Sequence, residues 1–363
     1  MWSKAIRFAS LQHGLYLSTP VRFEQICIRM VPHSPLFVVF MKAVFLDRGS
    51  FAPEVPIVCP DGVNDWQLYH NTSAEQILDR CRDADIVFTN KVCLDHAALI
   101  ALPQLKLIAV TATGTNNIDL ETCRERNIRV VNATGYGTAS VAEHALLLML
   151  ALSRKLPAYI AANQQQQWAR SAFFCDLVAP MQTLDGKVLT LVGAGTLGRA
   201  VAERARAFGM TIVLAERPQA ETVRPGYSAF ESALALGDFV SLHCPLTEQT
   251  HELINRRSLA LMKPTAILIN TGRGALVNEA DLLAALSSAR LAGAGLDVAS
   301  TEPPAPDHLI WQLAALSNVI VTPHIAWAAD EAMNNLMMQI VAKVGQFIAH
   351  HNSPTEHRAP DGL

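Results

Sequence analysis

Residues 188–198 read Val188-Leu-Thr-Leu-Val192-Gly193-Ala-Gly195-Thr-Leu-Gly198. The first five are apolar or β-branched and predict a strand, and the pattern over Leu197–Phe208 predicts a helix. In a strand–turn–helix context, this glycine spacing is typical of dinucleotide binding. The first glycine permits the tight turn, the second lets the backbone approach the pyrophosphate, and the third allows close packing of helix on strand. The helix N-terminus offers free N–H groups to the phosphates. A turn without a ligand is the alternative.

Strands and helices alternate on both sides of this turn. Before it, apolar runs predict strands over Lys42–Leu46, Ile86–Thr89, Leu107–Thr111 and Arg129–Asn132, with helices over Ser73–Arg82 and Asp95–Leu102. From the turn onward, the predicted strands are Val188–Val192, Thr211–Ala215, Phe239–Leu242, Ala266–Asn270, Leu291–Leu296 and Val319–Thr322, and Glu331–Ala349 is a last helix. The predicted fold class is therefore α/β, with two doubly wound, Rossmann-like domains built on parallel sheets.

The composition agrees with two such domains. The 363 residues exceed one ordinary domain, and half of them are hydrophobic while 17% are charged, which excludes a disordered chain. A net charge of −3 argues against a nucleic-acid binder, and no apolar run reaches the roughly 18 residues of a membrane span. The seven cysteines form no C-x-x-C pair. We therefore expect no metal site and no disulfide framework, but free thiols in the reducing cytoplasm.

Residues 1–40 differ from the rest of the chain. They show no clear period and carry four basic side chains against a single acid, Glu24. A targeting peptide can have this composition, but no cleavage-site pattern or continuous amphipathic helix accompanies it. We expect this extension to be a disordered tail or the product of a start codon assigned too early, with Met41 as the true beginning.

A long apolar helix is predicted from Ser140 to Ser153. It is apolar nearly all round, which favours burial between domains or subunits. Ser140 with Glu143 three residues later predicts a capping box at its start. The glutamine-rich segment Asn163–Trp168 follows.

Glu216 follows the second strand after the glycine turn. An acid at this place accepts hydrogen bonds from the adenine ribose hydroxyls and repels the 2′-phosphate of NADP. This favours NAD as the cofactor. Arg217 beside it could bind that phosphate instead, so NADP remains an alternative.

Arg273, Glu302 and His324 follow three later strands and together predict a reaction site. Arg273 stands between two glycines, where a guanidinium can hold a carboxylate or polarise a carbonyl. A neighbouring carboxylate favours the charged form of an imidazole, so His324 could protonate a carbonyl oxygen as hydride arrives. A surface arginine and a structural histidine are the alternatives. The shared carboxyl edge of the sheet argues against both, because ligands collect there.

These motifs together resemble the D-2-hydroxyacid dehydrogenase family, and within it the glycerate dehydrogenase (hydroxypyruvate reductase) branch. The matching stretches are Thr89–Lys91, Ala112–Asp119, Ser140–His144, Gly193–Gly198, His243–Leu246, Asn270–Arg273, Leu296–Val298, Glu302–Pro304 and Pro323–Trp327, in the family's order. One departure is Glu216, which stands where many members have aspartate.

The resemblance implies roles for individual residues. Arg273 would orient the substrate, His324 would be the general acid for reduction, and Glu302 would hold and charge the histidine. Substrate would bind the backbone amides of Thr113 and Gly114 and the side chain of Lys91, although a solvated lysine is an equal alternative. The implied cofactor residues are Gly193, Gly195, Thr196, Leu197, Gly198, Glu216, Cys244, Thr271, Gly272, Asp297, His324 and Trp327, with Asp297 meeting the carboxamide.

The resemblance also implies an architecture and an activity. A discontinuous substrate domain would take residues 41–139 and 329–363, and an NAD-binding domain with a dimerisation helix would take residues 140–328. The homodimer would reduce a small 2-keto acid to a D-2-hydroxy acid with NAD(P)H. Hydroxypyruvate to D-glycerate is the expected reaction, and glyoxylate is a further candidate. The alternatives are another member such as phosphoglycerate dehydrogenase, or a non-catalytic NAD-sensing corepressor. Neither nucleic acid nor a membrane is expected as a partner.

Overall fold

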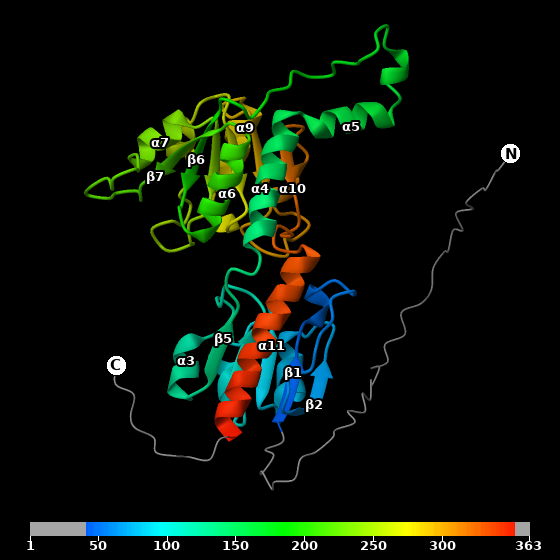
Figure 1. The fold of residues 1–363 in the computed structure, drawn as a ribbon, viewed down its shortest axis with the longest axis vertical. Coiled ribbons are helices and arrows are strands. Elements are labelled where there is room, and N and C mark those ends of the chain that lie inside the picture. Colours follow the sequence, from blue (N-terminus) through cyan, green and yellow to red (C-terminus); the bar gives the residue numbers. More distant parts are fainter. Residues whose placement is uncertain (1–40, 353–363) are drawn as a thin grey trace, which may run out of the picture. The chain divides into compact units, whose positions relative to one another are not determined.

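The computed structural model describes residues 41–352. The expectations about residues 1–40 lie outside the described residues, as do residues 353–363. Two parallel β-sheets with helices packed on them make up the described chain (Figure 1), which confirms the predicted α/β class.

The first sheet has five parallel strands in the order β2-β1-β3-β4-β5. They are β1 (Met41–Phe45), β2 (Val63–Leu68), β3 (Ile86–Thr89), β4 (Leu107–Val110) and β5 (Arg129–Asn132). Short helices connect them, namely η1 (Arg48–Ser50), η2 (Ala74–Gln76), α1 (Ile77–Cys81), α2 (His96–Ile100) and α3 (Leu120–Glu125). The strand order reverses between β1 and β3, and such a switch point opens a crevice at the carboxyl ends of the two strands.

The last helix of the chain covers one face of this sheet. Helix α11 (Asp330–Asn352) follows the second sheet in sequence but packs on β4 and β5 of the first (Figure 1). Its buried Leu336, Ile340 and Val344 join Phe45 and Phe88 in one hydrophobic core. The chain therefore returns to its first sheet at its end.

The second sheet has six parallel strands in the order β11-β10-β9-β8-β6-β7. They are β6 (Val188–Val192), β7 (Thr211–Ala215), β8 (Phe239–Leu242), β9 (Ile267–Asn270), β10 (Gly293–Leu296) and β11 (Val319–Val321). Its helices are α4 (Thr138–Ser153), α6 (Thr196–Ala207), α7 (Phe230–Leu236), α8 (Arg256–Leu261), α9 (Glu279–Ser287) and α10 (Ile310–Ala314), with the single turn η4 (Gly274–Leu276). Helices α4 and α6 bury one face of the sheet, and α7 to α10 bury the other.

Strand β2 and the start of α4 differ from what the sequence predicted. Strand β2 is an edge strand with exposed Asn64 and Asp65, residue types that are rare in strands, so its sequence gave little signal. Helix α4 begins at Thr138 without a side-chain cap, so the expected capping box at Ser140 is wrong. The Ser140 hydroxyl instead donates to the carbonyl of Ala326 at 2.5 Å.

An arm extends from the end of α4. Helix α5 (Leu156–Gln164) is bent by 63° from α4, and the turn η3 (Trp168–Arg170) and an irregular segment follow (Figure 1). The Tyr159 hydroxyl donates to the carbonyl of Ala179 and ties the returning segment to α5. Within residues 41–352, no single helix is long and apolar enough to cross a membrane. In that part of the chain, the bent pair of α4 and α5 meets the test of length and composition when the two helices are taken together.

The packing of α11 predicts a stability effect that depends on burial. Replacing the fully buried Ile340 by Ala should lower the free energy of unfolding by about 2–5 kcal/mol, because it removes apolar contacts and leaves a cavity. Met338→Ala on the same helix, at a side chain 66% exposed, should change it by less than about 0.5 kcal/mol. Equilibrium unfolding in urea measures both. Equal effects of the two substitutions would show that α11 does not pack as described.

Candidate active site

The glycine turn after β6 has the geometry that a dinucleotide requires. Gly193 has φ +100°, and a Cβ there would lie 2.5 Å from the backbone nitrogen of Cys244 after β8. A Cβ on Gly198 would collide with the carbonyl oxygen of Gly193. At Gly195, by contrast, an added Cβ meets no described atom within 4 Å, so the backbone is open to a ligand. Gly193 and Gly198 thus allow close backbone packing, and Gly195 leaves space for a ligand.

Polar groups around the turn also fit a dinucleotide. Helix α6 begins at Thr196, followed by Leu197, and its N-cap residue Gly195 has no side chain that could cap it. The first N–H groups of the helix are therefore available to phosphates. The buried hydroxyl of Thr271, which Gly272 follows at the end of β9, has no hydrogen-bond partner among residues 41–352. Burial raises the pKa of the Cys244 thiol to about 11, so the thiol is uncharged at neutral pH beside the glycine turn. The residues present therefore fit the predicted cofactor.

Glu216 already has hydrogen-bond partners within the protein. Its side chain is 3% exposed, and both carboxylate oxygens already accept hydrogen bonds from Arg217 and Arg224. The hydrogen bond from Arg224 is the largest influence on its pKa, which falls to about 2. Glu216 is therefore ionised but engaged within the protein.

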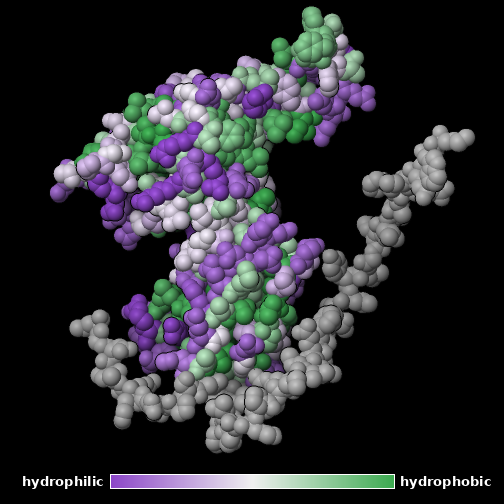
Figure 2. Space-filling view, in the orientation of Figure 1, coloured by the Kyte–Doolittle hydropathy of each residue, from purple (hydrophilic) through white to green (hydrophobic). Residues whose placement is uncertain are grey.

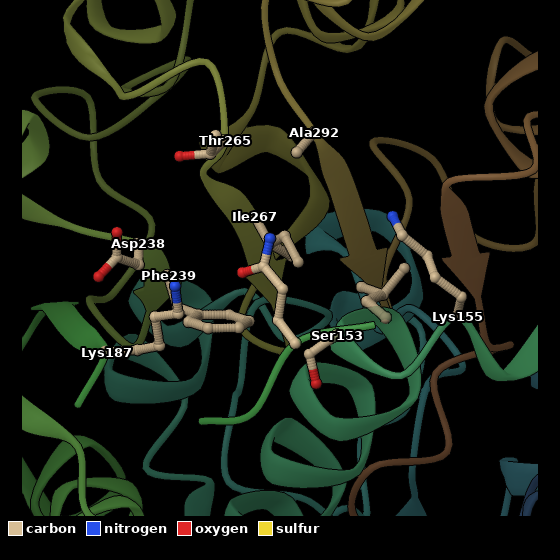
Figure 3. A pocket seen from close by; sticks show the side chains of 10 residues that line it. Ser153, Lys155, Lys187, Asp238, Phe239, Thr265, Ile267 and Ala292 are labelled. Carbon is tan, nitrogen blue, oxygen red and sulfur yellow. The ribbon is translucent and has the colours of Figure 1, made fainter. Parts of the chain in front are cut away.

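Two pockets lie at opposite edges of the second sheet. One, with a volume of about 390 Å³, lies next to Glu216 and is walled by residues that follow β7 and β8, which is where the adenine half of a dinucleotide would lie. The other is a small pocket of about 110 Å³ at the amino ends of the strands, lined by Lys187, Asp238 and Thr265 (Figure 3). Asp238 in this small pocket already pairs with Lys263 at 2.8 Å. The glycine turn, Arg273, Glu302 and His324 follow the carboxyl ends of the strands, so the small pocket is not part of the candidate active site.

The structure brings Glu302 and His324 together. Glu302 follows β10, His324 follows β11, and Nδ1 of the imidazole lies 2.5 Å from Oε2 of the carboxylate. Oε1 of Glu302 accepts the N–H of Ala299, which holds the carboxylate in place. Burial raises the pKa of Glu302, but the bonds from His324 and Ala299 and the charge of Lys91 outweigh it, and the pKa is lowered overall. Glu302 therefore stays ionised below the pH at which a glutamate usually takes up a proton.

The loop that carries His324 is fastened to Asp297. The Asp297 side chain is 1% exposed and accepts the hydroxyl of Thr322 at 2.6 Å and the N–H groups of Ile325 and Ala326 at 2.9 Å each. His324 itself has φ +55°. The Asp297 carboxylate therefore holds the loop that carries His324, and its expected contact with the cofactor carboxamide stays a prediction.

Sequence reasoning missed two residues that support the site. His144 of α4 lies 3.0 Å from the Thr322 hydroxyl through Nε2 and so buttresses the same loop. Asp47, after β1, accepts the N–H groups of Asn90 and Lys91 at 2.8 and 2.7 Å and fixes the loop at the switch point of the first sheet. The position of Asp47 just beyond a strand end was the available signal for it.

Arg273 converges with the predicted substrate loops. It follows β9, and a Cβ placed on Gly114 would lie 2.8 Å from Nη2 of its guanidinium. The neighbouring Thr113 carbonyl accepts from Asn132 at 2.7 Å, which fixes that loop. The pKa of Lys91 is lowered, first by burial and then by the positive charge of Arg273. Arg273, Lys91 and the residue 113–114 backbone therefore border one site.

Trp327 packs against aromatic side chains. Its ring packs edge-on against Phe51 at 5.8 Å and Tyr136 at 6.4 Å between ring centroids. These partners belong to the core of the first sheet, so Trp327 anchors the end of the His324 loop in that core. Its contact with the cofactor stays a prediction.

A doubly wound sheet with an open glycine turn, beside an arginine and a hydrogen-bonded His–Glu pair, defines a dinucleotide-dependent oxidoreductase. Residues 146–326 match the family model described as the D-isomer specific 2-hydroxyacid dehydrogenase, NAD binding domain. The chain is 40% identical to the glycerate dehydrogenase of Methylorubrum extorquens over 85% of its own length and 96% of the relative's. It is 35% identical to the hydroxypyruvate reductase of Blautia hydrogenotrophica, over 85% and 97% of the two chains.

The fold agrees with solved structures of related enzymes. The NADPH-dependent glyoxylate/hydroxypyruvate reductase of Sinorhizobium meliloti superposes with a TM-score of 0.70 at 26% identity, covering 85% of this chain and 95% of the other. The protein therefore belongs to the D-2-hydroxyacid dehydrogenase family, and it is an NAD(P)-dependent oxidoreductase. The resemblance inferred from the sequence motifs is confirmed.

The His324–Glu302 pair predicts a change in pH dependence. In Glu302→Gln, the imidazole loses the negative charge that favours its protonated form. The rate of keto-acid reduction should fall by about 10²-fold, and the loss of rate as the pH falls through the lowered pKa of Glu302 should no longer appear. A pH–rate profile of kcat measures this. Asp307→Asn, which removes an exposed carboxylate from the same loop, should leave the profile in place. An unchanged profile in Glu302→Gln would exclude the pair from proton transfer.

Proposed function

We propose that the protein reduces hydroxypyruvate to D-glycerate with NAD(P)H, and glyoxylate as a second substrate. The observation that carries the proposal is the 2.5 Å contact between His324 and Glu302, in a site that Arg273 also borders. A cation for the substrate carboxylate and a proton donor for its carbonyl are the two groups that reduction of a 2-keto acid requires. The names of the M. extorquens and B. hydrogenotrophica relatives support hydroxypyruvate as the keto acid.

In the proposed mechanism, Arg273 and the backbone of Thr113 and Gly114 hold the substrate carboxylate and orient the carbonyl. Nδ1 of His324 is bonded to Glu302, so Nε2 delivers the proton to the carbonyl oxygen. When bound, NAD(P)H supplies the hydride to the carbonyl carbon. Hydride on carbon and a proton on oxygen together give the 2-hydroxy acid. Glu302 then favours the uptake of a new proton by His324.

The proposed domain organisation follows from the same assignment. Residues 140–328, with the second sheet, would bind the cofactor, and residues 41–139 with 329–363 would form the substrate domain. The packing of α11 on the first sheet supports this discontinuous arrangement. We also propose a cytoplasmic location, in keeping with the unpatterned cysteines of the sequence.

The substrate assignment is tested by a panel of keto acids. With purified enzyme, hydroxypyruvate should give the highest kcat/KM in NAD(P)H oxidation, ahead of glyoxylate, pyruvate and 3-phosphohydroxypyruvate. Arg273→Ala should lower kcat/KM by about 10²- to 10³-fold, because it removes the charged partner of the carboxylate. Arg206→Ala, at an exposed arginine far from the turn on α6, is the control. Preference for the phosphorylated acid would indicate a phosphoglycerate dehydrogenase. Tight NADH binding without turnover would indicate a corepressor.

We also propose that the protein is a homodimer joined through its arm. Four large hydrophobic side chains on the arm are 57–92% exposed, namely Trp168, Phe173, Phe174 and Leu177. Figure 2 shows hydrophobic side chains on this arm. Exposed apolar patches of this kind mark protein interfaces. A second copy of the chain is the proposed occupant, and Leu147 of the adjoining helix α4 is also 54% exposed.

The dimer proposal predicts the effect of a charge on the arm. Phe174→Asp should convert the dimer to a monomer in light scattering coupled to size-exclusion chromatography, because it would bury a carboxylate in the interface. Ile100→Asp places the same charge at another exposed apolar residue, on α2, and should leave the dimer intact. A monomeric wild type, or a Phe174→Asp variant that stays dimeric, would refute the proposal.

A further inference from the structure

The carboxylate of Glu216 has no acceptor position left for a ribose. Oε1 accepts the N–H of Arg217 at 2.8 Å and Nη2 of Arg224 at 2.7 Å. Oε2 accepts the N–H of Arg224 at 3.1 Å and its Nε at 2.6 Å. A carboxylate offers about four lone-pair positions, and all of them are filled from within the protein. As it stands, Glu216 cannot take the ribose hydroxyls that select NAD.

Arg224 is held firmly and still has donors to offer. Its guanidinium is fixed by Glu216 and also stacks over the ring of Tyr227, 3.9 Å from the centroid. The side chain is nonetheless 49% exposed. Of the five N–H donors of a guanidinium, two bind Glu216, and no partner is found for the other three within residues 41–352. The protein therefore presents a preorganised, half-exposed guanidinium at the carboxyl end of β7.

The pairing also changes the charge at this strand end. Glu216 no longer presents an uncompensated negative charge to a ligand, because Arg224 neutralises it. The pKa of Glu216, about 2, means that this pair persists throughout the working pH range. A 2′-phosphate at this strand end would meet the free donors of the Arg224 guanidinium, a group that recognises phosphate well.

We propose that Arg224 is a specificity-determining residue that binds the 2′-phosphate of NADPH, with Glu216 as the residue that positions it. The enzyme then uses NADPH at least as well as NADH. This replaces the preference for NAD that Glu216 alone had suggested. The proposal rests on the dinucleotide site of the proposed reductase, but it does not depend on which keto acid that reductase takes.

Cofactor binding without any keto acid tests the proposal. Dissociation constants for NADPH and NADH are measured by calorimetry on the wild type, and 2′-AMP is compared with 5′-AMP as the isolated fragment. Arg224→Gln removes the guanidinium, Arg224→Lys keeps the charge but loses the planar fork, and Arg206→Gln is a remote control on α6. The wild type should bind NADPH as tightly as NADH, within about threefold, or more tightly, and should bind 2′-AMP more tightly than 5′-AMP.

The variants should separate phosphate binding from general cofactor binding. Arg224→Gln should weaken NADPH by about tenfold or more and change NADH by less than about threefold, and Arg224→Lys should fall between Gln and wild type. Arg206→Gln should leave the ratio of the two affinities unchanged. A wild type that binds NADH more than about tenfold better than NADPH would overturn the proposal, because Glu216 must then release Arg224 and bind the ribose. An unchanged ratio in Arg224→Gln would also overturn it. Failure to reduce hydroxypyruvate would refute only the proposed substrate.

Discussion

The buried carboxylate of Asp297 is the constraint on which the reaction site depends. It accepts three hydrogen bonds from the segment between Thr322 and Ala326, and its own backbone carbonyl accepts the N–H of His324 at 2.7 Å. These bonds keep His324 in a left-handed conformation, at φ +55°, that a non-glycine residue rarely adopts unaided. The imidazole is therefore positioned by the end of β10 rather than by its own sequence neighbours.

The partner carboxylate is fixed by the same part of the sheet. The segment after β10 is anchored where the N–H of Ser300 donates to Glu279 of α9 at 2.8 Å, and Ala299 binds Glu302 directly. Gly274, next to Arg273, lies against Ala299 so closely that a Cβ there would collide with its backbone. The arginine, the acid and the histidine thus stand on interlocked strand ends. Little reorganisation remains for the moment of reaction, which is how preorganised sites lower a barrier.

Sequence reasoning succeeded where structure is local. Strands β6, β7 and β8 have the bounds that their apolar runs predicted, and Glu302 meets His324 because consecutive parallel strands end at one edge. It failed where tertiary contacts override local preference. Strand β2 pairs through its backbone with β1 despite its polar residues. Ser140 looked like a helix cap, but its hydroxyl donates a hydrogen bond to the carbonyl of Ala326, 186 residues further along the chain. No local pattern carries that information.

Glu216 shows the difference between a position and a role. The glycine motif and the strand spacing predicted correctly where an acid would stand, because both are properties of one strand–turn–helix unit. What the acid does depends on Arg224, which stands eight residues later and binds it. The turn between the two residues has no periodic pattern from which its conformation could be predicted. Once an arginine fills both oxygens, the same carboxylate stops being a hydroxyl acceptor and becomes the support for a cation. The charge that a cofactor meets is therefore set by the pair, not by the residue that the motif identifies.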